Sequence, residues 1–221
     1  MKLLLSAIIK FIMGLVLVAA ALFLPAGALS FANGWLFIGL LFIPIMVLGL
    51  VLFFRSPQLL QKRLDAKETG NTQKGVVAVS GLCFFGGFIV AGLDFRFGWS
   101  YVPVVCVIIA SVVLLVSYAL YAEVMRENVY LSRKIEVQKD QKVVDTGLYG
   151  IVRHPMYAVT IWLFLSIPIV LGSWWAMLCF LPYILLIVVR ILDEEKQLTA
   201  GLVGYSEYKM RVKYRIIPFI W

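Results

Sequence analysis

Long apolar runs constrain the fold of this chain more than any other feature. Because a helix rises about 1.5 Å per residue, roughly 20 apolar residues are needed to cross about 30 Å of membrane hydrocarbon. Four segments fit that length: Leu3–Leu24, Gly34–Phe54, Val76–Leu93 and Tyr101–Ala122. The sequence therefore predicts four membrane-spanning helices before residue 123.

A fifth apolar stretch, Ala158–Val189, is too long for a single straight span. It contains Gly172-Ser173 near its middle, and such a pair breaks helices readily. We interpret the stretch as a tight helical hairpin whose first half is short. The prediction is then an all-α polytopic integral membrane protein with about six membrane helices, two of them in a C-terminal hairpin.

Composition supports the membrane assignment and argues against nucleic-acid binding. Hydrophobic residues make up 62% of the chain and charged residues 14%, whereas about a quarter of a soluble domain is charged. The net charge of +8 has the sign that nucleic acids attract, but the Lys and Arg residues lie between the apolar runs. We therefore predict membrane lipids, and not nucleic acid, as partners.

The connections between the apolar runs alternate between strongly basic ones and ones with almost no charged residues. They are basic at 55–74, 126–153 and 196–215, and nearly bare at 25–33, 94–100 and 172–173. Basic connections stay on the cytoplasmic side of a membrane. We therefore predict an integral protein of the inner (cytoplasmic) membrane with both termini in the cytoplasm.

The chain is expected to form one membrane domain over residues 1–221. Residues 1–122 hold the four spans and an amphipathic interfacial helix near 56–69, where Ser56-Pro57 is typical of a helix start. Residues 123–221 hold two polar segments, one on each side of the hairpin. Because both are predicted on the same membrane face, they should meet there and form a site above the hairpin.

The first polar segment contains the only histidine of the chain, His154, directly before Pro155 at an expected helix start. Arg153, Tyr149 and Tyr157 surround it with hydrogen-bond donors. Donors beside a helix N-terminus favour a carboxylate or a phosphate. The competing interpretation is a histidine with a purely structural role.

The second polar group lies where the last span ends, at Arg190, Asp193, Glu194 and Glu195. Arg190 and Glu194 are four residues apart, so they share a helix face. They would form either an interfacial salt bridge or a site in which carboxylates face a cationic ligand and the arginine holds an anionic group. In the tail, Tyr208 suits either stacking on an adenine or anchoring at the interface.

The three cysteines, Cys83, Cys106 and Cys179, all lie inside apolar segments. The chain has no CxxC pair and no Cys/His cluster. We therefore predict free, structurally inert thiols and no metal site.

Three segments of the sequence carry a family resemblance. They are G-L-Y-G-I-V-R-H-P-M-Y at 147–157, R-I-L-D-E-E-K-Q-L at 190–198, and G-Y-S-E-Y through Y-R-I-I-P at 204–218. Their order and spacing, with an apolar hairpin between the first two, resemble the isoprenylcysteine carboxyl methyltransferase family and its phospholipid methyltransferase relatives. One departure is Val159, where relatives often have glycine.

The resemblance implies an S-adenosylmethionine-dependent methyltransferase with a cytoplasmic cofactor pocket roofed by the tail, and S-adenosylhomocysteine as product. It implies a lipophilic acceptor that enters from the bilayer: the carboxylate of a prenylcysteine-like compound, a lipid amine or a thiol. Carried over by position, the cofactor-binding residues would be Tyr149, Arg153, His154, Pro155, Tyr157, Glu194, Glu195 and Tyr208. Arg190 would orient the nucleophile, and His154 or Glu194 would accept a proton from an amine or thiol.

Two rival functions remain at this level. An NADPH-dependent membrane reductase of the sterol-reductase type shares a similar arginine-histidine-proline block, but Glu194-Glu195 favours the methyltransferase. A non-enzymatic membrane component is the second rival. Against it, the spans hold almost no ionisable residues beyond Lys10, and the polar groups gather at one rim, as an interfacial enzyme requires.

Overall fold

The computed structural model describes residues 2–64, 71–131 and 137–221, and all its regular elements are helices, with no strand in these ranges. The elements are α1 (Lys2–Ala26), α2 (Ala32–Arg55), α3 (Pro57–Leu64), α4 (Asn71–Phe97), α5 (Val104–Glu127), η1 (Gly147–Gly150), α6 (Pro155–Val170), α7 (Trp174–Phe180), α8 (Pro182–Gly201) and α9 (Tyr205–Arg211). The predicted all-α class is confirmed.

Within the described ranges, five helical segments are long and apolar enough to cross a membrane, which makes the chain an integral membrane protein. They are α1, α2, α4, α5 and the nearly continuous pair α7–α8. The predicted hairpin is present, because α6 ends at Val170, Gly172 turns the chain at φ +77°, and α7 begins at Trp174. With 16 residues, α6 spans about 24 Å and is the short half of that hairpin.

The observed helices extend beyond the apolar runs that predicted them. The third span was predicted from Val76, whereas α4 begins at Asn71 and includes the buried polar residue Gln73. An apolar run marks only the part of a helix that lies in the hydrocarbon. Polar residues can continue the same helix where the chain leaves the membrane. Of the helix predicted near 56–69, Pro57–Leu64 is helical, and residues 65–69 lie outside the described part of the chain.

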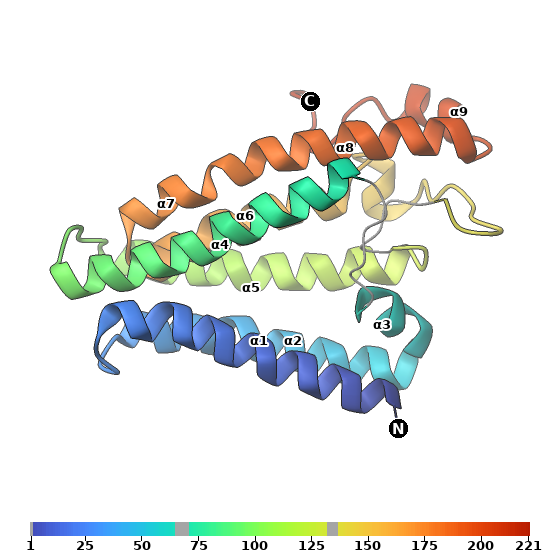
Figure 1. The fold of residues 1–221 in the computed structure, drawn as a ribbon. Coiled ribbons are helices and arrows are strands. Elements are labelled where there is room, and N and C mark those ends of the chain that lie inside the picture. The colour runs from blue at the N-terminus through green and yellow to red at the C-terminus, as the bar shows by residue number, and fades with distance from the viewer. Residues whose placement is uncertain (1, 65–70, 132–136) are drawn as a thin grey trace.

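The spans alternate in direction along the bundle (Figure 1). The antiparallel pair α1 and α2 lies along one side, and α4 to α8 form the rest; α1 packs along α4, and α5 packs along α6. The N-terminus, α3, the start of α4 and α9 all lie toward one end of the bundle, which we call the α9 end (Figure 1).

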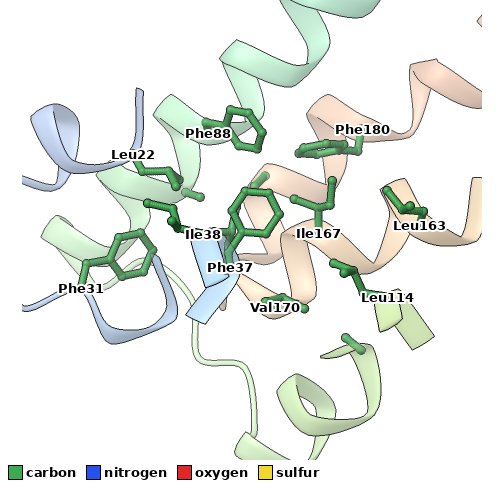
Figure 2. Close-up of a cluster of buried hydrophobic side chains, with 14 of the residues drawn as sticks. Leu22, Phe31, Phe37, Ile38, Phe88, Leu114, Leu163, Ile167, Val170 and Phe180 are labelled. Atoms are coloured by element: carbon green, nitrogen blue, oxygen red, sulfur yellow. The ribbon is translucent and has the colours of Figure 1, made fainter. Parts of the chain in front are cut away.

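A buried apolar cluster joins the spans away from the α9 end. Leu22, Phe37, Leu114 and Phe180 are fully buried and come from α1, α2, α5 and α7, respectively. Figure 2 shows these side chains in one buried cluster with Ile167 of α6. Close packing of this kind, rather than a hydrophobic driving force, holds helices together in lipid. The cluster fixes the hairpin against the N-terminal spans and so fixes the walls of the site described next.

The loops at the opposite end are joined by a buried carboxylate. Asp94, in the last turn of α4, accepts hydrogen bonds from Ser100 N at 2.8 Å and from the Ser173 hydroxyl at 2.5 Å. The Ser173 hydroxyl also caps α7 by accepting from Ala176 N at 3.0 Å. The hairpin turn is thereby tied to the turn between α4 and α5.

Candidate active site

A cavity of about 800 Å³ extends from the α9 end into the bundle. Its polar wall is formed by residues of the two predicted polar segments and of α9. Its apolar wall, deeper along the helices, includes Leu41 and Ile45 of α2, Phe84 of α4, and Leu163 of α6. One continuous space therefore connects charged side chains to a surface suited to a hydrocarbon chain.

The backbone of the arginine-histidine block (Arg153 and His154) is hydrogen-bonded to the C-terminal tail. Arg153 N donates to Tyr214 O at 2.9 Å, and His154 N donates to Arg215 O at 2.8 Å. The Arg153 guanidinium adds bonds from Nη1 to the carbonyls of Val212 and Lys213 at 2.7 and 2.8 Å. These bonds place the tail over the start of α6.

Glu195 connects the same block to the tail through charge. Its Oε1 accepts from Arg153 Nε at 2.7 Å and contacts His154 Nε2 at 3.3 Å, while its Oε2 accepts from Arg215 Nε at 3.1 Å. The carboxylate is 4% exposed and does not line the cavity. Because an ionised carboxylate only accepts hydrogen bonds, the Nε2 of His154 must carry the proton, and its Nδ1 is left with a lone pair in the neutral ring.

Arg190, Tyr157 and Glu194 form a chain of hydrogen bonds on the cavity wall. Arg190 Nε donates to the Tyr157 hydroxyl at 3.0 Å, and that hydroxyl donates to Glu194 Oε2 at 2.6 Å. Arg190 and Glu194 share a face of α8, as their spacing predicted. The Tyr157 phenol joins them, so the site holds a cation and an anion linked through a neutral group.

Tyr149 and Tyr208 form the wall between η1 and α9. The Tyr208 hydroxyl donates to Tyr149 O at 2.7 Å, and the Tyr149 hydroxyl accepts from Asn128 Nδ2 at 3.0 Å. Burial raises the pKa of both phenols well above the ordinary value. Both therefore stay neutral at physiological pH and act as hydrogen-bonding and stacking groups rather than as bases.

Tyr205 belongs to the third sequence block but was not among the predicted site residues. It lines the cavity, is 4% exposed, and among the described side chains its hydroxyl is the one buried nitrogen or oxygen without a hydrogen-bond partner. Burial raises the pKa of this phenol well above the ordinary value, so it is a neutral donor. An unpaired buried hydroxyl is costly, and in a native protein such a group pairs with an ordered water or with a ligand.

The turn before Tyr149 depends on a glycine. Gly147 has φ +55°, and Glu127 folds against it so that its two carboxylate oxygens accept from Leu148 N at 3.1 and 3.0 Å. A Cβ at residue 147 would lie 1.7 Å from Glu127 Oε1. Glu127 is a further residue that sequence inspection did not identify, because its partner lies 21 positions away.

We expect Gly147→Ala to destabilise the protein by about 2 kcal/mol or more, because left-handed backbone costs about 1–2 kcal/mol in a residue with a Cβ and the clash adds to it. Thermal unfolding of the detergent-solubilised protein measures this. Gly98→Ala is the matched control, since Gly98 has φ +62° and no atom within 4 Å of a new Cβ. Equal losses in the two variants would contradict the role of Glu127.

The structure brings most of the predicted site residues together. Those that line the cavity are Tyr149, Arg153, His154, Tyr157, Arg190, Glu194 and Tyr208. Two others lie behind its wall: Pro155, the buried first residue of α6, and Glu195. Val159 is buried against Val124 and Tyr149 and supports the wall from behind.

Comparison with known families gives one match. Residues 104–200 match the Isoprenylcysteine carboxyl methyltransferase (ICMT) family. The match covers α5, the arginine-histidine block, the hairpin, and the helix that carries Arg190 and Glu194. The resemblance predicted from the three sequence blocks is therefore confirmed for residues 104–200, which are similar to the ICMT family. No curated protein matches the chain.

The ICMT-like part contains the larger share of the cavity wall, and α1 to α4 and α9 lie outside it. The family is one of membrane methyltransferases, which agrees with the spans observed here. Among the described residues, no group of three or more His, Cys, Asp or Glu side chains could hold a metal ion. The three cysteines are free thiols.

Proposed function

We propose that this protein transfers a methyl group from S-adenosylmethionine to a lipophilic acceptor at the cytoplasmic face of the inner membrane. The observation that carries the proposal is the single cavity that joins the Arg190–Tyr157–Glu194 chain to the apolar surface between α2, α4 and α6. A soluble cofactor and a hydrocarbon chain need these two environments to meet. The basic connections at the α9 end support placing that end in the cytoplasm.

The residues of the cavity suit this cofactor. The Glu194 carboxylate would favour its cationic sulfonium and amino groups, and Tyr205 and Tyr208 offer a hydroxyl and an aromatic face to its nucleoside. When bound, the cofactor supplies an electrophilic methyl group. The unpaired Tyr205 hydroxyl supports a polar ligand on this side of the cavity.

Methyl transfer is an in-line displacement, so the chain has to align two ligands and exclude water. The guanidinium of Arg190 would hold an anionic nucleophile where the polar wall of the cavity meets its apolar wall. With a carboxylate acceptor no proton moves. With an amine or thiol acceptor, either the Glu194 carboxylate or Nδ1 of His154 would take the proton that the nucleophile loses.

The function is tested by incubating the purified full chain in nanodiscs with methyl-labelled S-adenosylmethionine and three acceptors: an S-farnesylcysteine, phosphatidylethanolamine and a long-chain thiol. Label is expected in the organic extract with at least one acceptor. The absence of label from all three extracts would contradict the proposal.

We expect Tyr205→Phe to weaken S-adenosylhomocysteine binding by about tenfold, because the hydroxyl loses its ligand partner. The ligand-free variant should unfold at the wild-type temperature or higher, since a buried hydroxyl without a partner has been removed. Titration calorimetry and thermal unfolding measure the two effects. Tyr101→Phe is the control, because Tyr101 is 80% exposed; unchanged binding in Tyr205→Phe would contradict the assignment.

A further inference from the structure

Gln73 lies in the first turn of α4, outside the residues that match the ICMT family. Its side chain is almost completely buried, with 2% exposed. A buried glutamine is costly unless both ends of its amide are paired. Here both ends are paired, and both partners lie on α8.

The amide of Gln73 fits between a cation and an anion. Its Oε1 accepts from Arg190 Nη1 at 3.0 Å, and its Nε2 donates to Asp193 Oδ2 at 2.5 Å. Arg190 and Asp193 are three residues apart and so lie on one side of α8. The opposite amide orientation would set donor against donor and acceptor against acceptor, so the partners fix the orientation that is found.

The contact with Arg190 reaches into the proposed site. Arg190 lines the cavity, whereas Gln73 does not. The guanidinium is held through Nε by Tyr157 of α6 and through Nη1 by Gln73 of α4. Residues of α6 and α4 therefore help to fix which way the planar guanidinium faces, and planar bidentate recognition depends on that direction.

We propose that Gln73 is a positioning residue that orients the guanidinium of Arg190 toward the reacting group of the acceptor. The inference rests on the proposed function and adds a residue of the N-terminal spans to it. Residues one to two turns further along α4, Val76, Val77 and Ser80, line the same cavity. The α4 helix is thus part of the site, and not only a membrane anchor.

The test compares Gln73→Leu with wild type as full chains in nanodiscs, with labelled S-adenosylmethionine and whichever of the three acceptors above is methylated fastest. We expect kcat to fall about tenfold or more, because loss of orientation acts on the reacting geometry. The dissociation constant of S-adenosylhomocysteine should stay within about twofold, since Gln73 does not line the cavity. Gln61→Leu is the control, because Gln61 is an exposed glutamine on α3.

A second variant separates positioning from folding. Gln73→Glu in its protonated form offers the same acceptor to Arg190 and the same donor to Asp193, whereas its ionised form repels Asp193. The ratio of its kcat to that of wild type should therefore rise as the pH is lowered, because a lower pH favours the protonated form.

The outcomes are distinguishable. A wild-type kcat in Gln73→Leu would overturn the inference. It would also be overturned if Gln73→Leu lost S-adenosylhomocysteine binding and turnover to the same extent while the kcat ratio of Gln73→Glu did not change with pH. If wild type itself methylates none of the acceptors, the proposed function fails and this inference fails with it.

Discussion

Replacing Glu195 by alanine should lower the free energy of unfolding by about 3–5 kcal/mol, the cost of breaking a buried ion pair and leaving its partners unpaired. The carboxylate holds Arg153, His154 and Arg215 within 3.3 Å, and it is almost fully buried. Its loss would leave the Arg153 guanidinium inside the protein without a counter-charge. The tail that closes the proposed site should then detach from the start of α6.

Thermal or denaturant unfolding in detergent measures this loss, and limited proteolysis of the tail reports the detachment. Glu207→Ala is the matched control, because Glu207 is an exposed glutamate on α9. Glu195→Gln should be less damaging, since an amide oxygen still accepts from Arg153. A Glu195→Ala protein as stable as the control would show that the ion-pair cluster does not hold the tail.

The second large effect is expected for Arg190→Met, which should reduce kcat by about a hundredfold while the protein still binds S-adenosylhomocysteine. Methionine keeps much of the side-chain volume and removes the charge that would hold the acceptor. Arg190→Lys should recover little activity, because an ammonium lacks the planar fork that Tyr157 and Gln73 orient.

Single-turnover methyl transfer and titration calorimetry on the same preparations separate chemistry from cofactor binding. Arg96→Met is a suitable control, because Arg96 lies in the last turn of α4, away from the α9 end, and does not line the cavity. If Arg190→Met retained wild-type kcat with every acceptor, Arg190 would have no role in positioning the nucleophile.

Local patterns in the sequence were sufficient to predict the spans and the hairpin. Apolar length identified α1, α2, α4 and α5, and Gly172-Ser173 identified the turn between α6 and α7. The spacing of Arg190 and Glu194 correctly placed them on one helix face. Each of these features depends on residues that are close together in the chain, where the period of the helix decides the outcome.

The sequence could not separate the two adjacent glutamates. Consecutive residues on a helix point about 100° apart. Glu194 therefore lines the cavity, while Glu195 faces Arg153 and the C-terminal tail. The tail had to be placed before that difference could be predicted. Glu195 is therefore better assigned to holding Arg153 and His154 in position than to contacting the cofactor.

The roles of Gln73 and Tyr205 could not be predicted from the sequence either. Gln73 meets Arg190 across 117 positions of sequence, and no local pattern marks it apart from its polarity beside an apolar run. Tyr205 lies in a block that resembles the family, but only its burial without a hydrogen-bond partner distinguishes it from the neighbouring Tyr208. Both depend on how α4, α8 and α9 pack together.

Calorimetric titration of the purified protein with S-adenosylhomocysteine, and separately with NADPH, tests the central claim most directly. We predict saturable binding of S-adenosylhomocysteine that is weakened about tenfold or more in Glu194→Gln, because the amide removes the negative charge that would attract the amino group. NADPH should not bind. Binding of NADPH in place of S-adenosylhomocysteine, or equal affinity in wild type and Glu194→Gln, would contradict the assignment of this cavity to a methyltransferase.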